Sequence, residues 1–304
     1  MQRKIVKHGK STLSVSLPSK YVQANNLKNG QLMNIEVSKG KLILSAKEKH
    51  FDKIETDLTE SEEWPIVRIL RHLYTAGYDE IDVKYTQQKL PLIRKSLHHI
   101  TGLEIVEVGP THCKLKCMSS LDENEYDSLI KRIMWMVLSE FDRFLEDIAE
   151  GTLATDEVQE ILNTVSRLCN LCKRIINKKS IYDSTDSIYA YDFIDSMIEM
   201  SVLVLYAYDY LKKNKNIKLT EKEVAFIKQT RDYFYDLILA YQNTNLEKTR
   251  TFFEQRKETF DDFLELLNGK NPVIMHYFLM ILRNLTPVGN HIIMLGLRKK
   301  DKQQ

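Results

Sequence analysis

The stretch KSTLSVSLPSKYVQANNLKNGQLMNIEV, residues 10–37, changes its structural character several times within a short length. β-forming residues are followed by Pro18, which cannot continue a central strand. Residues 19–24 can form about one or two helical turns. Lys28-Asn29-Gly30 then predicts a turn, because asparagine and glycine tolerate positive φ. The pattern predicts a strand, a short helix and a second strand, connected by tight turns.

The flanking residues extend this pattern to a segment of four short strands. Strands are predicted at residues 3–8, 12–17, 31–37 and 41–46, and we assign residues 1–50 to one domain. So small a unit cannot bury enough apolar surface by itself. We therefore expect it to form an obligate dimer with a second copy of the chain.

The basic charge of the chain is concentrated in this first domain. Residues 1–50 contain ten Lys and Arg residues against two acidic residues, a net charge of +8, while residues 51–304 contain 34 against 40, a net charge of −6. Such an asymmetry is typical of a segment that contacts a polyanion, most often nucleic acid. A solvated basic arm is the alternative that charge alone leaves open.

The composition of the whole chain predicts a soluble protein. Of its 304 residues, 43% are hydrophobic and 28% charged, an ordinary globular composition. The longest apolar runs, Val202–Ala207 and Pro272–Leu282, are shorter than the roughly 20 residues that a membrane span needs. The first residues show no secretory signal. We expect a cytoplasmic protein without membrane insertion.

Two further segments follow the basic domain. Residues 62–119 alternate helical stripes with strand-like runs and predict a small α+β module. Residues 122–299 predict six long helices, separated by short polar breaks, in an antiparallel bundle of two three-helix repeats. Thr220 and Glu223 have the spacing of a capping box at the start of the fourth helix. The fold class is therefore mostly α with a small β domain.

Candidate metal ligands occur as close pairs in the sequence, among them a cysteine pair and a histidine pair. Cys169 and Cys172 have the spacing of half a zinc site, but they lie on an apolar helical stripe, which favours packing in the core. His98 and His99 are adjacent and would point to different faces of a helix, so we expect them to be solvated.

The sequence offers no catalytic constellation. Gly9-Lys10-Ser11 lacks the glycine that a phosphate-binding loop needs five positions earlier, where Lys4 stands. The eight histidines form no HxxxH or HExxH pair, and no Ser-His-Asp order is evident. We therefore expect a protein that is not an enzyme.

The first domain resembles the AbrB/SpoVT swapped-hairpin DNA-binding family. The matching elements are Arg3-Lys4-Ile5, residues 14–18 ending in Pro18, residues 26–31 with the Leu-x-x-Gly turn, and residues 33–37. In that family two chains exchange hairpins to form one closed β-barrel on double-stranded DNA. The resemblance places seven residues at the DNA: Arg3, Lys4, Lys7, His8, Lys10, Ser11 and Lys20. The family often has arginines just after the proline, where this chain has only Lys20.

The remainder of the chain resembles the PhoU family of phosphate-uptake regulators, whose fold is two repeats of three helices. The resemblance is carried by residues 283–291, Arg-Asn-Leu-Thr-Pro-Val-Gly-Asn-His, and by residues 165–168. PhoU proteins commonly hold metal ions with Glu and Asp clusters, whereas the corresponding residues here are neutral: Asn163, Ser166, Thr286 and Asn290. Neutral amides and hydroxyls are poor ligands for a multinuclear cation site. We expect neither a bound metal nor a cofactor.

Together these patterns predict a DNA-binding transcriptional regulator of phosphate uptake. Its basic domain would contact DNA, and its helical domain would sense phosphate status or bind a partner. The alternative is an adaptor that dimerises through the first domain and regulates a phosphate transporter or a sensor kinase by protein contact. With a single arginine in the first 50 residues, bidentate guanine contacts are scarce, so DNA shape and backbone contacts would provide much of the specificity.

Overall fold

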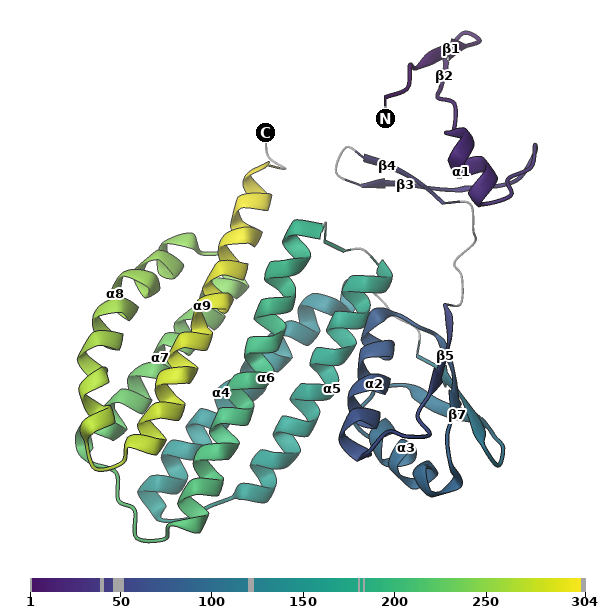
Figure 1. Cartoon of the computed structure of the whole chain (residues 1–304). Helices are drawn as coiled ribbons and strands as arrows, with labels where there is room; N and C mark the ends of the chain where they lie inside the picture. Colours follow the sequence, from purple (N-terminus) through teal and green to yellow (C-terminus); the bar gives the residue numbers. More distant parts are fainter. Residues whose placement is uncertain are drawn as a thin grey trace. The chain divides into compact units, whose positions relative to one another are not determined.

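The computed structural model describes residues 2–38, 41–45, 52–119, 123–179, 181–182 and 184–301. Within this part the protein is mostly helical, with nine α-helices and three small sheets (Figure 1). The chain divides into two compact units, Met1–Phe51 and Asp52–Gln304. The predicted domain boundaries at residues 1, 50 and 122 lie outside the described residues.

The first unit has the predicted order of elements, with shorter strands. Its five elements are β1 (Val6–His8), β2 (Thr12–Ser14), α1 (Ser19–Ala24), β3 (Asn34–Ser38) and β4 (Lys41–Ser45). β1 pairs with β2 and β3 with β4, both antiparallel, as two separate two-stranded sheets. The described residues of a single chain thus contain two hairpins and no closed barrel. Residue 46, the predicted end of the fourth strand, lies outside the described residues.

The second unit begins with a four-stranded sheet. Its elements are β5 (Lys53–Asp57), α2 (Glu63–Ala76), β6 (Glu80–Lys84), α3 (Leu90–Leu97), β7 (Leu103–Val108) and β8 (His112–Cys117). The strand order is β5-β6-β8-β7, with β5 parallel to β6 and the other pairs antiparallel. Apolar side chains of α2 and α3, among them Ile66, Leu70 and Ile93, share a buried core with those of the strands.

The sheet starts earlier than the predicted module, which began at residue 62. The sequence does not indicate β5, because Lys-Ile-Glu-Thr-Asp contains only one apolar residue, Ile54. This edge strand is instead formed by backbone hydrogen bonding to β6, in the register Lys53↔Glu80 to Asp57↔Lys84. Pairing with an edge partner is a tertiary contact that local hydrophobicity does not report.

Six long helices follow, as the sequence predicts. They are α4 (Tyr126–Glu150), α5 (Thr155–Lys179), α6 (Ser184–Lys213), α7 (Glu221–Asn243), α8 (Leu246–Leu264) and α9 (Pro272–Asp301). Their inner faces form one continuous hydrophobic core. The predicted capping box is confirmed, since Thr220 accepts from the Glu223 N–H and the Glu223 carboxylate accepts from the Thr220 N–H. The relation of the helices as two repeats stays a prediction.

One helix in the described part of the chain passes a test of length and apolar composition for a membrane span. This stretch, Pro272–Arg298, makes up most of α9, and 56% of its most apolar window is buried inside the protein. Its buried residues, including Ile274, Phe278 and Leu285, belong to the core of the bundle. The apolar composition of α9 is therefore accounted for by its packing in the core of the bundle.

The α+β part and the bundle are held together by the end of α5. The Arg174 guanidinium, 1% exposed, donates to the carbonyl oxygens of Tyr74 and Tyr78 at 2.7 and 2.8 Å, and pairs with Asp79 at 2.5 Å. Lys178 adds an ion pair to Asp79 at 2.8 Å. The Tyr74 carbonyl, in the last turn of α2, thereby gains a second donor besides the Gly77 N–H, and the Tyr78 carbonyl, just beyond α2, gains a donor as well. Residues 52–301 thus form one unit where the sequence suggests two domains.

Candidate nucleic-acid interface

The predicted DNA-contacting residues gather at the first hairpin. β1 and β2 pair in the register Val6↔Ser14, Lys7↔Leu13 and His8↔Thr12, which leaves a three-residue turn, Gly9-Lys10-Ser11. Gly9 has φ +76°, a left-handed conformation that costs glycine little. The Ser14 hydroxyl donates to the Val6 carbonyl at 3.2 Å and further ties the strands. The turn presents Lys10 and Ser11 at the hairpin tip.

All seven candidate residues are solvent-exposed, but they belong to different elements. Lys7 and His8 lie on β1, Lys10 and Ser11 in the turn after it, and Arg3 and Lys4 immediately before β1. Lys20 instead lies in the first turn of α1. The hairpin therefore brings together four of the seven residues, with two more on the chain that leads into it.

The positive charges of this hairpin are not neutralised within the described part of the chain. Arg3, Lys4, Lys7 and Lys10 form no ion pair with any described carboxylate, in contrast to many lysines of the second unit, such as Lys53 with Glu80 at 2.8 Å. Exposed cations that form no ion pair with a described carboxylate can contact a polyanion without first breaking such a pair.

The first unit exposes several large apolar side chains. Ile5 is 68% exposed, Leu13 67%, Leu32 91% and Ile35 62%. Because side chains alternate across a strand, Leu13 lies on the same face as Lys7, its cross-strand partner, while His8 and Thr12 lie on the other. No described residue of the first unit is classed as buried. The described side chains of this unit thus enclose no core.

The short helix is anchored to the second hairpin. Pro18 precedes α1 with φ −61° and ψ 133°, and its carbonyl accepts from the N–H groups of Tyr21 and Val22 at 2.9 and 3.0 Å. The Tyr21 hydroxyl donates to the Leu44 carbonyl of β4 at 3.0 Å. This contact couples the helix that contains Lys20 to the β3–β4 hairpin.

The cysteine pair behaves as the apolar stripe predicts. Cys169 and Cys172 are both fully buried in the bundle core, and burial raises the pKa of the Cys172 thiol to about 12. No group of three or more His, Cys, Asp or Glu side chains within the described ranges is arranged to hold a metal ion.

The residues compared with PhoU proteins lie in two different environments, the core of the bundle and a cavity. His291 of α9 is fully buried, and its ring stacks on Phe193 with centroids 4.8 Å apart. Burial lowers the pKa of His291 to about 4, so the imidazole is neutral near pH 7. Asn163 and Ser166 of α5, in contrast, line a cavity.

That cavity contains residues that sequence reasoning missed. Arg71 of α2 and Lys95 of α3 line it together with His99, which follows α3. The expectation of a solvated histidine pair was wrong for His99, which is half-buried, whereas His98 is exposed. No local motif signals this group, because its members come from separate segments that only the packing of α2 and α3 on the bundle brings together.

Comparisons with models of protein families, with curated proteins and with solved structures find no match to this chain. The protein combines an exposed basic two-hairpin unit with a second unit, in which a four-stranded sheet and its helices pack on a six-helix bundle.

Proposed function

We propose that the protein is a dimeric DNA-binding transcriptional regulator of phosphate uptake. Its N-terminal unit would contact double-stranded DNA, and its helical unit would sense phosphate status or bind a partner. The observation that carries the DNA-binding part is the cluster of exposed cations on and just before the first hairpin, Arg3, Lys4, Lys7 and Lys10, which form no ion pair with any described carboxylate.

Electrostatics supports a DNA backbone as the target of this hairpin. Lysines that neutralise phosphates release condensed counterions, so their contribution to affinity is large and depends strongly on salt. The net charge of +8 in residues 1–50 is of the right sign, and the rest of the chain is acidic. Ser11 at the hairpin tip adds a hydroxyl donor suited to a phosphate oxygen.

The exposed apolar residues support a dimer as the DNA-binding form. Leu13, Leu32 and Ile35 are exposed, and none of the described side chains of the first unit is buried. A second copy that contributes its own hairpins would cover these faces and would double the number of cations on the DNA. This arrangement is the swapped-hairpin barrel that the resemblance to AbrB/SpoVT proteins implies.

The phosphate-related role rests on the resemblance of residues 165–168 and 283–291 to PhoU proteins. The observed order of six long helices in one core is compatible with that resemblance. On this proposal the helical unit acts by binding a ligand or a signalling protein, without catalysis.

The test is DNA binding by the full-length protein and by a triple variant, Arg3→Ala, Lys7→Ala, Lys10→Ala. Fluorescence anisotropy over a salt series would use promoter fragments of phosphate-transport genes and a random duplex. We expect at least a hundredfold loss of affinity at low salt. The slope of log K against log salt should also become shallower by about five, since a dimer loses six phosphate contacts at about 0.9 each.

A matched control removes the same charge from the second unit: Lys212→Ala, Lys213→Ala, Lys215→Ala, three exposed lysines at and after the end of α6. This control should bind DNA like the wild type. If the wild-type protein binds neither promoter nor random DNA at low salt, the DNA-binding proposal fails. The adaptor function, with a transporter or sensor kinase as partner, then becomes the better explanation.

A further inference from the structure

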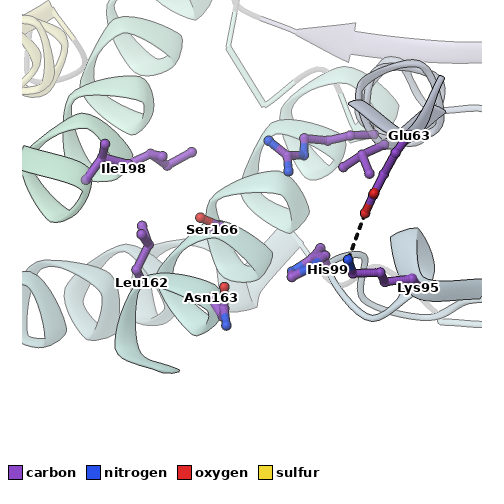
Figure 2. A pocket seen from close by; sticks show the side chains of 10 residues that line it. Glu63, Lys95, His99, Leu162, Asn163, Ser166 and Ile198 are labelled. Carbon is purple, nitrogen blue, oxygen red and sulfur yellow. Dashed lines mark hydrogen bonds and ion pairs between the residues drawn. The ribbon is translucent and has the colours of Figure 1, made fainter. Parts of the chain in front are cut away.

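An open-sided cavity of about 360 Å³ is formed in the second unit, where the α+β part meets the bundle. Its lining comes from α2, α3 and the residue after α3 on one side, and from α5 and α6 on the other. Figure 2 shows Asn163 and Ser166 on the helix opposite Lys95 and His99, with Ile198 on the neighbouring helix. The volume falls in the range of small-molecule sites.

The cationic part of the lining is centred on Arg71. Its guanidinium is partly buried, and its Nε has no solvent access and no hydrogen-bond partner among the described residues. Burial lowers the pKa of Arg71, and the neighbouring Arg68 lowers it further. The Nε–H group has given up water without gaining an acceptor among the described residues, which is unfavourable unless a ligand supplies one.

The groups around Arg71 add positive charge or neutral donors. The pKa of His99 is lowered by burial first and then by Arg71 and other cations nearby, and no acidic group contributes to this shift. One carboxylate, that of Glu63, does line the cavity, but it is paired with Lys95 at 2.7 Å. Asn163 and Ser166 provide uncharged polar groups on the opposite wall.

The remaining lining is apolar. Val67 of α2, Leu162 of α5 and both Ile198 and Val202 of α6 contribute aliphatic side chains to the cavity. A ligand that matches both parts needs an anionic head and an apolar body, because a bare inorganic anion would leave the aliphatic wall without contacts.

We propose that this cavity binds a small amphiphilic anion, a carboxylate or phosphate ester with a short aliphatic group, whose head is bound by Arg71. The planar guanidinium suits both heads, because each offers two oxygens for parallel hydrogen bonds. The inference goes beyond the proposed regulatory function and does not depend on DNA binding. A ligand here would contact α2 and α3 as well as the bundle.

Isothermal titration calorimetry of the full-length protein in low-salt buffer without DNA tests this site with four probes: n-hexyl phosphate, hexanoate, inorganic phosphate and 1-hexanol. We expect n-hexyl phosphate, hexanoate or both to bind at least tenfold more tightly than inorganic phosphate and 1-hexanol. The stronger of the two amphiphiles then identifies the preferred head group. If 1-hexanol bound as tightly as the amphiphiles, the requirement for an anionic head would be wrong. If inorganic phosphate bound as tightly, the requirement for an apolar body would be wrong.

Arg71→Gln should weaken binding of the preferred amphiphile by tenfold or more, because it removes the charged donors. The matched control is Arg68→Gln, one turn earlier on α2. Arg68 is exposed, stacks on Trp64 at 3.6 Å and does not line the cavity, so the loss of its charge near Arg71 should weaken binding by less than about threefold. A second variant, Ile198→Trp, fills the apolar side and should abolish binding even if Arg71→Gln does not fold. Wild-type affinity in either cavity variant would overturn the assignment.

Discussion

Glu140 is a buried carboxyl group in the core of the helical bundle. It lies on α4 and is 0% exposed; its Oε2 accepts a hydrogen bond from the Ser201 hydroxyl of α6, and its Oε1 has no partner among the described residues. Burial raises the pKa of Glu140 to about 8, although the Ser201 bond opposes the rise. The side chain is therefore largely protonated in the folded protein near pH 7.

The raised pKa of Glu140 predicts that the free energy of unfolding depends on pH. Between the ordinary pKa of 4.5 and about 8 the folded chain keeps a proton that the unfolded chain has lost, so the free energy of unfolding decreases as pH rises through this window. Glu140→Gln stays neutral and can keep the contact with Ser201. We expect its melting temperature to exceed that of the wild type, by an amount that grows from pH 5.5 to pH 8.

Differential scanning fluorimetry across this pH range measures the difference, and Glu146→Gln is the control. Glu146 is an exposed carboxylate on the same helix, and its variant should differ from the wild type by the same small amount at every pH. A constant difference for Glu140→Gln would contradict an elevated pKa at this site.

At the scale of elements, the C-terminal end of α5 holds α2 and the sheet against the bundle. Arg174 connects two carbonyl groups and the Asp79 carboxylate, and Asn177 donates to the Thr75 carbonyl at 2.6 Å. Gly77, the C-cap of α2, has φ +105°, and a Cβ there would lie 2.8 Å from the Lys178 side chain. Close packing at the end of α2 thus depends on both the glycine and the buried arginine.

Arg174→Met should destabilise the second unit by about 2–4 kcal/mol, because it removes the buried donor of two backbone carbonyls and leaves Asp79 with Lys178 alone. Urea unfolding monitored by circular dichroism measures the loss. Arg167→Met, an exposed position on the same helix, is the control and should change stability by less than about 0.5 kcal/mol. If both variants unfolded at the same urea concentration, Arg174 would not be the main connection.

At the scale of the whole molecule, the exposed apolar side chains of the first unit predict that two copies of the chain associate. Leu13, 67% exposed, lies at the centre of the β1–β2 hairpin, where a second copy would cover it. We expect the wild-type protein to sediment as a dimer and Leu13→Glu to sediment as a monomer, because a buried unpaired carboxylate opposes association. The control is Leu297→Glu, which places the same charge at a 55% exposed leucine of α9 and should leave the dimer intact.

Analytical ultracentrifugation between micromolar and tens of micromolar protein distinguishes these outcomes. A monomeric wild type over this range would contradict dimerisation through the hairpins. A dimeric Leu13→Glu variant would instead place the contact elsewhere in the chain.

The sequence by itself determined the elements that local physics specifies. Apolar residues repeat along the six long helices, Thr220 and Glu223 cap α7, and Gly77 and Gly151 end α2 and α4 in the left-handed conformation. Each of these features depends on side chains within a few residues of one another, or on the freedom of glycine at positive φ. The charge asymmetry that marks the first unit as basic is likewise a property of composition.

Only the tertiary structure decided which distant residues meet. β5 forms because β6 provides a backbone edge with which it pairs, and Arg174 reaches α2 from a position about a hundred residues further along the chain. Arg71 lines the same cavity as Asn163 and Ser166, although these residues are far apart in the sequence. No local pattern indicates such neighbours, since long-range contacts form only when separate amphipathic elements bury their apolar faces together. Sequence periodicity therefore predicts the helices, and their packing decides where the cavity and the buried charges lie.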